Sequence, residues 1–179
     1  MACSNVTLAG LKRDCETSKG GIKVVYIAKY TEALAAAIKA ELATATTAST
    51  VPTASTADTF YVYEFRRNTG SMTSTLNVDD ANGVNYVSTD VVLQFNKMDT
   101  KKRTEIAALS LEEMILLVVD ANNHNWFIGL DAPVCASAGT AQTGTGVGDG
   151  NFYQITLQGN DDSYPYPWIG ELPTPGNNA

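Results

Sequence analysis

The stretch that decides the fold is a pair of long strand-like segments around a short turn. It reads Ser71-Met-Thr-Ser-Thr-Leu-Asn-Val78, then Asp79-Asp-Ala-Asn-Gly83, then Val84-Asn-Tyr-Val-Ser-Thr-Asp-Val-Val-Leu-Gln-Phe95. Side chains on the flanking segments alternate between two faces, the period of a β-strand, and Asn82-Gly83 favours the positive φ angles of a tight turn. The sequence therefore predicts a long β-hairpin over residues 71–95.

The alternation gives this hairpin one apolar and one polar face. The apolar face carries Val87, Val91, Leu93 and Phe95, and no Lys or Arg lies between Arg67 and Lys97. An ordinary solvated sheet would explain the polar face. A surface without Lys or Arg also gives a passing polyanion no partner for its phosphates. We therefore take its polar residues as the candidate site: Thr73, Thr75, Asn77, Ser88, Asp90 and Gln94.

The rest of the chain is mostly strand-like. Apolar periodicity and caps predict two short helices, one over residues 32–43 after Thr31 and one from Asp99 to about Glu113. Further strands are predicted over residues 21–30, 60–66, 114–120, 126–130 and 151–158. The fold class is therefore α+β, mainly β: an antiparallel β-sandwich or barrel with one or two short flanking helices.

No composition shift divides the chain, so residues 1–179 are expected to form a single domain. Residues 44–59 are almost all Ala, Thr and Ser, and we expect an exposed loop that orders only against a neighbour. Residues 136–150 are expected to form a Gly-rich loop. Residues 160–179 are expected to be a Pro-containing tail, in which two prolines exclude a helix or a central strand.

The composition excludes several classes of protein. Lys and Arg number 12 against 19 Asp and Glu, a net charge of −7, which disfavours non-specific binding to the outside of a nucleic-acid duplex. A hydrophobic content of 44% is enough to bury a core. No apolar run approaches the roughly 18 residues of a membrane helix, and the first residues are not the basic start of a signal peptide. We expect a soluble protein made in a cytoplasm, without membrane insertion.

Four motifs could suggest chemistry, and none has the residues it needs. His124 lies in a predicted turn without an adjacent nucleophile. Residues 144–150 lack the Lys of a phosphate loop. Residues 79–85 do not fit a calcium loop, because Gly83 at its sixth position places Val78 first and Thr89 twelfth, where the loop needs carboxylates. Cys15 and Cys135 have no basic cluster beside them and are expected to be small buried or half-buried residues. The sequence predicts no enzyme, no cofactor, no metal site and no disulfide framework.

Three segments together resemble the major tail or tail tube proteins of tailed phages that infect Bacteroidetes. The resemblance covers most of residues 8–166 and is weakest over residues 32–59. Its segments are Leu8-Ala-Gly-Leu with Cys15 and Gly20–Tyr30; Tyr63–Val78 with Gly83–Asp90, Met98-Asp-Thr and Arg103–Leu109; and Tyr153–Gly159 leading into Tyr164-Pro-Tyr166. These are structural rather than catalytic sequences, so they indicate a kind of virion protein better than its place in the virion.

The resemblance implies antiparallel sheets with a flanking helix, assembled into hexameric rings that stack as a hollow tube. One long hairpin per subunit would contribute to a continuous inner barrel. The polar hairpin face would then line a lumen through which double-stranded DNA slides during ejection. The implied partners are other copies of the chain and other tail proteins, and the implied location is the virion tail, assembled in the host cytoplasm.

Two other functions remain open at this point. A head decoration or other auxiliary capsid protein would also be small, β-rich and non-catalytic. A soluble ligand-binding module is the third possibility, with an aromatic surface built from Trp126, Phe127, Tyr164, Tyr166 and Trp168.

Overall fold

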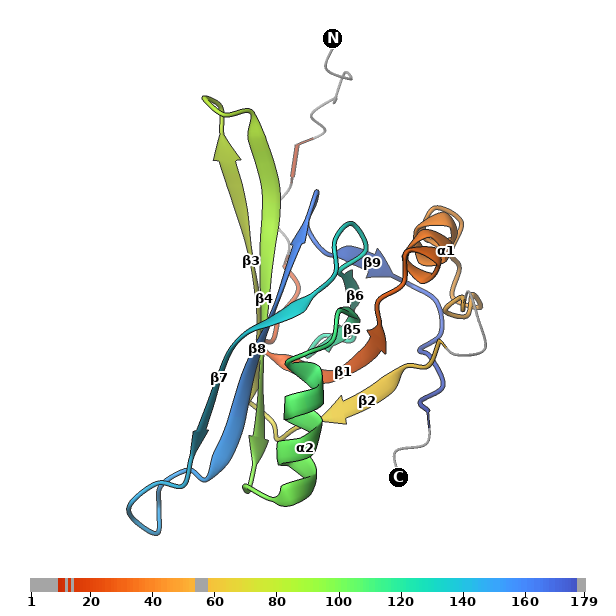
Figure 1. The fold of residues 1–179 in the computed structure, drawn as a ribbon. Helices are drawn as coiled ribbons and strands as arrows, with labels where there is room; N and C mark the ends of the chain where they lie inside the picture. The colour runs from red at the N-terminus through yellow and green to blue at the C-terminus, as the bar shows by residue number, and fades with distance from the viewer. Residues whose placement is uncertain (1–9, 12, 14, 54–57, 177–179) are drawn as a thin grey trace.

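The computed structural model describes residues 10, 11, 13, 15–53 and 58–176, which form two antiparallel sheets and two helices (Figure 1). This confirms the predicted α+β, mainly β class and selects the sandwich over the barrel for the single chain. The elements are β1 (Ile22–Lys29), α1 (Glu32–Leu42), β2 (Tyr61–Glu64), β3 (Gly70–Asp79), β4 (Val84–Asn96), α2 (Thr100–Leu109), β5 (Met114–Asp120), β6 (Asn125–Ile128), β7 (Cys135–Gln142), β8 (Phe152–Asp161) and β9 (Tyr166–Trp168).

The two sheets differ in length and position. The five-stranded sheet has the order β2-β1-β5-β6-β9, and the four-stranded sheet has the order β3-β4-β8-β7. The predicted long hairpin is confirmed as β3 and β4, paired from Gly70 opposite Leu93 to Asp79 opposite Val84. In Figure 1 the four-stranded sheet stands to one side of the molecule, and α1 lies on the other side of the five-stranded sheet.

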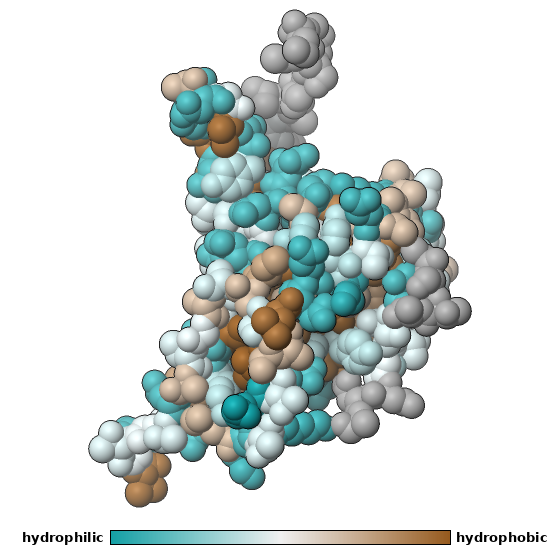
Figure 2. Space-filling view, in the orientation of Figure 1, coloured by the Kyte–Doolittle hydropathy of each residue, from teal (hydrophilic) through white to brown (hydrophobic). Residues whose placement is uncertain are grey.

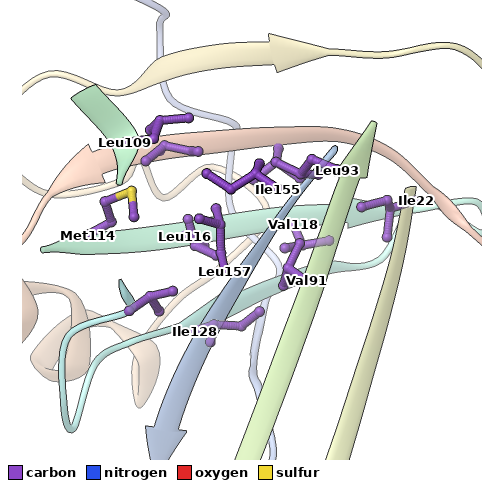
Figure 3. Close-up of a cluster of buried hydrophobic side chains, with 13 residues drawn as sticks. Ile22, Val91, Leu93, Leu109, Met114, Leu116, Val118, Ile128, Ile155 and Leu157 are labelled. Atoms are coloured by element: carbon purple, nitrogen blue, oxygen red, sulfur yellow. The ribbon is translucent and has the colours of Figure 1, made fainter. Parts of the chain in front are cut away.

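Two hydrophobic clusters hold these layers together. The first lies between the sheets, where the four-stranded sheet contributes Val91, Leu93, Ile155 and Leu157 (Figure 3). The second lies between the five-stranded sheet and α1. β5 is buried on both faces: Leu116 and Val118 belong to the first cluster, whereas Ile115 and Leu117 belong to the second. This double burial explains its continuous apolar sequence.

Both helices start at the predicted caps. The Thr31 side chain accepts a hydrogen bond from the Leu34 N–H at 3.2 Å, and Asp99 accepts one from the Lys102 N–H at 2.8 Å. The predicted end of the second helix near Glu113 is wrong, because α2 ends at Leu109. There the chain closes a tight last turn and then straightens to enter the buried strand β5, so the pairing of β5 limits the helix.

The predicted Gly-rich loop over residues 136–150 is wrong in its first half. β7 runs from Cys135 to Gln142 and pairs with β8, with a bulge between Ala136 and Ala138, so only residues 143–150 form the loop. The β7 side chains are small and mostly exposed, so they carry no hydrophobic signal. The strand forms because β8 offers a row of backbone donors and acceptors, and this pairing does not depend on side chains.

The predicted tail over residues 160–179 is partly wrong. β8 continues to Asp161, and β9 adds the segment Tyr166–Trp168 to the edge of the five-stranded sheet. An edge position is where a proline-containing strand is tolerated, as the sequence indicated. Trp168 is only 2% exposed and packs edge-on against Phe127 at 5.7 Å between ring centres. Trp168 therefore anchors this part of the tail in the hydrophobic cluster that contains Phe127.

The loop over residues 44–59 is confirmed as irregular where the structure describes it. The expectation that it orders only against a neighbour is wrong, because it contacts its own chain. Ala45 and Val51 pack against the cluster beneath α1, and the Ser49 carbonyl accepts a hydrogen bond from the Glu171 N–H at 2.7 Å. These contacts anchor the loop on its own chain. Residues 54–57 lie outside the described residues.

A buried carboxylate fixes the end of β8 against the rest of the molecule. Asp161 is 2% exposed, and its two oxygens accept hydrogen bonds from the Gly129 and Asp131 N–H groups, each at 2.9 Å. The Asp131 carboxylate in turn accepts from Lys39 on α1 at 2.5 Å and from the Tyr166 hydroxyl at 3.0 Å. This network ties the four-stranded sheet to α1 and β9, so the sheet has a fixed orientation.

Candidate functional site: a sheet without Lys or Arg and with two open edges

The structure places all six predicted site residues on one face of the hairpin. Thr73 lies opposite Asp90 and Thr75 lies opposite Ser88, and residues directly opposite in an antiparallel pair point to the same side. Asn77 and Gln94 follow at even spacing on the same strands. The other side of β4 carries the buried Val87, Val91 and Leu93. The predicted division into an apolar and a polar face is therefore confirmed.

The polar face continues across the whole four-stranded sheet. Asp90 lies opposite Gln158 on β8, which lies opposite Cys135 on β7. Gln154 and Thr156 have the same spacing as Gln158 and lie on the same face. We call this surface the outer face of the sheet; its members are Ser71, Thr73, Thr75, Asn77, Tyr86, Ser88, Asp90, Val92, Gln94, Gln154, Thr156, Gln158, Ala138 and Thr140.

The chemistry of the outer face is uncharged with a single carboxylate at its centre. None of the four strands contains a Lys or an Arg. The amide nitrogen of Gln158 donates to the Asp90 carboxylate at 2.9 Å and to the Ser88 hydroxyl at 3.2 Å, which links β8 to β4 across this face. A wall of hydroxyl and amide groups binds water well and offers no fixed cation to a phosphate.

Among the residues that the structure describes, no strand pairs with the outer edges of this sheet. β3 forms one edge and β7 the other, and neither strand contains a Pro or a Lys, the residues that commonly protect an edge. The Lys97 N–H donates to the Asn151 carbonyl. Backbone groups alternate in direction along a strand, so the N–H and C=O groups of the odd-numbered residues of β4 point toward β8. The same alternation applies to β8 and then to β7. It places the N–H groups of Gly139 and Ala141 on the side away from β8, at the open edge of β7.

The single histidine lies in the turn between β5 and β6, as predicted. Its Nδ1 is 3.4 Å from the Asp120 carboxylate, and its side chain is 67% exposed. Asp120 also accepts the main-chain N–H groups of Asn122 and His124, at 2.7 and 2.8 Å. Burial raises the pKa of Asp120, but hydrogen bonds from His124, Trp126 and Asn122 outweigh it and lower the pKa. The carboxylate therefore organises a turn.

The two loops that resemble ligand-binding motifs use their carboxylates internally. Asp79 accepts from the Ala81 N–H at 3.0 Å and from the Asn82 side chain at 2.6 Å, and Asp149 accepts from the Thr145 and Gly146 N–H groups at 2.8 and 2.6 Å. These bonds close the β3–β4 turn and the loop after β7. Among the residues that the structure describes, no three His, Cys, Asp or Glu side chains gather as metal ligands.

Two expectations about other surface residues are wrong. Cys15 and Cys135 are exposed rather than buried, Cys135 because it begins the open edge strand β7. The aromatic ligand surface does not exist as a unit, because Phe127 and Trp168 are buried in the core while Tyr164 is exposed. Phe127, Tyr166 and Trp168 share the face of the sheet toward α1, whereas Trp126 is on the other side of β6 and Tyr164 precedes β9.

Sequence reasoning placed the candidate site on the β3–β4 hairpin alone and missed the residues that β7 and β8 contribute. β8 was predicted as a strand, but its position beside β4 follows from a pairing across about 60 residues that no local pattern contains. The sequence did contain one sign of this polar face: Gln154, Thr156 and Gln158 alternate with the apolar residues of β8.

No family model matches the chain, and comparison with curated proteins and with solved structures found no similar protein. In the described part of the chain, no helix is both long and apolar enough to cross a membrane.

Proposed function

We propose that this chain is a virion structural protein that assembles into stacked rings forming a phage tail tube, the conduit for DNA ejection. The observation that carries the proposal is the four-stranded sheet: an outer face without Lys or Arg, on a sheet whose two edges are both open. The resemblance to tail tube proteins supports the same function. The protein would act in the virion tail and bind other copies of itself and other tail proteins.

The strand order is suited to closing a ring. In a sheet of four antiparallel strands, the two edge strands run in opposite directions. When copies related by rotation are placed side by side, β3 of one copy lies antiparallel to β7 of the next, so one antiparallel sheet continues from copy to copy. Pairing of β3 with β7 satisfies their free backbone groups, and closure into a ring removes both open edges of the four-stranded sheet.

The size of such a ring fits a DNA conduit. Six copies of a four-stranded sheet make 24 strands. With strands about 4.8 Å apart and tilted by roughly 40°, the barrel would be about 48 Å across at the backbone. Side chains on the inside narrow this opening, which still admits a DNA duplex. In this arrangement the outer face of the sheet lines the lumen, and DNA passes without a cation to hold it.

The proposed role is mechanical and requires no catalysis. The exposed His124 and the turn-forming carboxylate beside it are not needed for assembly. His124→Asn should therefore leave ring and tube formation unchanged, as seen by negative-stain electron microscopy. Lost infectivity of particles with normal tails would contradict a purely structural role.

The proposal is tested by blocking one edge without changing the sheet. Ala141→Pro removes an N–H that points to the open edge of β7, whereas Ala141→Thr keeps it and favours a strand. Wild type and Ala141→Thr should form rings or tubes in negative-stain images and sedimentation, while Ala141→Pro should remain monomeric with an unchanged circular dichroism spectrum. A wild type that forms only monomers or discrete trimers would refute the tail tube. Rings from Ala141→Pro would refute the edge pairing.

A further inference from the structure

The end of the β3–β4 hairpin projects beyond the rest of its sheet. β8 ends at Asp161, which lies opposite Val87, so in the described part of the chain the hairpin beyond this level is a ribbon of two strands. Figure 1 shows this ribbon standing clear of the body of the molecule. An isolated two-stranded ribbon is at best marginally stable in water, so a partner surface would stabilise it.

The ribbon exposes apolar side chains on both faces. Leu76 lies at the base of the ribbon, opposite Val87, and Val78 lies beyond it; both are on the face that continues the core side of the sheet, and they are 46% and 58% exposed. Val84 and Tyr86 lie on the opposite face and are also exposed. In Figure 2 hydrophobic atoms are visible at the tip of this projection. Apolar groups gathered at a projecting tip mark a contact surface more than an ordinary solvated turn.

An apolar groove lies between β2 and α2, toward the end of the molecule opposite the tip (Figure 1). Its volume is about 440 Å³, and it borders β2, the last strand of the five-stranded sheet. Its apolar walls come from Tyr61, Val62, Tyr63, Phe95, Ile106 and Leu109. Glu64, Lys101, Lys102 and Glu105 complete its lining. The groove can therefore accept apolar side chains with charged residues beside them.

The two ends carry opposite charge. The tip has Asp79 and Asp80 and no Lys or Arg. The chain around the groove carries six basic residues, Arg66, Arg67, Lys97, Lys101, Lys102 and Arg103, against Glu64, Asp99 and Glu105. These segments have a net charge of 6 − 3 = +3. The charged residues that line the groove itself balance, with Lys101 and Lys102 against Glu64 and Glu105, so the excess lies beside the groove in Arg66, Arg67, Lys97 and Arg103. The groove end is therefore basic overall.

We infer that the tip of one copy docks in the groove of a copy in the next ring, with Leu76 and Val78 seated between β2 and α2 and Asp80 against the basic rim. The inference rests on the proposed stacking of rings. When all copies point the same way, the tip end of one ring faces the groove end of the next. Contact between unlike ends also gives the stack one direction, because like ends would place acidic tips together.

The test separates stacking from ring formation. Leu76→Asn with Val78→Thr removes the apolar contact at exposed positions, so folding and edge pairing remain. Ile169→Thr is the matched control, because Ile169 is 59% exposed and lies outside the hairpin and the groove. The tip variant should form rings but lower the ring-to-ring association constant by at least about tenfold in sedimentation. The control should stack like wild type.

Charge exchange tests the partner surface. Asp80→Lys should also stop assembly at rings, and adding Lys101→Glu, which places an acidic group at the start of α2, should restore tubes. Tubes of normal length from the tip variant, or no recovery in the exchanged pair, would overturn this inference while leaving the ring proposal intact. Absence of rings in the wild type would overturn both.

Discussion

The proposed lumen predicts what positive charge on its wall would do. Thr75→Lys and Asp90→Lys place two lysines on the outer face of the sheet, at an exposed and a half-buried position on neighbouring strands. The change is +1 at Thr75 and +2 at Asp90, or +3 per chain. In a ring of six copies this becomes a girdle of about +18, because symmetry repeats each substitution.

The magnitude follows from counterion release. If about six phosphates pair with lysines in one ring, the affinity for DNA falls about 10³-fold between roughly 50 and 200 mM salt. The assay is the rate of DNA release from particles carrying the variant tube, followed with a DNA-binding dye. Release should be slow at low salt and should recover steeply over this range.

The control carries the same charge away from the proposed lumen. Ala36→Lys with Glu41→Lys also adds +3 per chain, on α1, which lies behind the five-stranded sheet. Release from these particles should match wild type at every salt concentration. Normal release from the Thr75→Lys, Asp90→Lys particles at low salt, with intact tubes in micrographs, would remove the outer face from the lumen. Equal slowing in the α1 variant would show that the effect is not specific to the wall.

Three further predictions concern the network that positions the sheet. Asp161→Ala leaves the two main-chain N–H groups without a partner in a buried site, so it should lower the free energy of unfolding by about 2–5 kcal/mol in urea denaturation, and a cost below about 1 kcal/mol would contradict the network. Gly129 has φ +86°, and a Cβ there would lie 2.7 Å from the Val134 side chain, so Gly129→Ala should cost roughly 1–3 kcal/mol by thermal unfolding. Burial raises the pKa of Asp131, but hydrogen bonds from Lys39, the Asp162 N–H and Tyr166 lower it more. The free energy of unfolding should therefore decrease as the pH falls below the ordinary Asp pKa of about 4. Asp131→Asn should flatten this pH dependence.

The parts of the fold that could be predicted are those in which one local signal dominates. The hairpin is readable because its apolar and polar residues alternate on β4 next to an Asn-Gly turn. β5 is readable because burial on both faces requires an unbroken apolar run. α1 is readable because Leu34 and Ile38 recur at helical spacing behind a Thr cap.

The parts that could not be predicted depend on contacts distant in sequence. β7 has few apolar residues, and only its pairing with β8 makes it a strand. Asp161 shows no feature of a buried residue in its sequence, because both of its hydrogen-bond partners lie about 30 residues away. The candidate site shows the same division: the hairpin residues follow from alternation, whereas Gln154 and Gln158 join them only through the register between β4 and β8.

The open edges of the four-stranded sheet and the projecting ribbon both expose groups that neighbouring copies of the chain could cover. Natural sheets protect long edges with Lys, Pro, bulges or covering loops, and β3 has none of the first two over ten residues. The ribbon end of the same hairpin exposes Leu76 and Val78 to water. Both features would favour aggregation in a chain that works alone, and both become favourable when neighbouring copies cover them. In the proposed tube, ring closure would cover the edges of the four-stranded sheet and stacking would cover the tips, so the two features together favour a tube over a monomer or a discrete trimer.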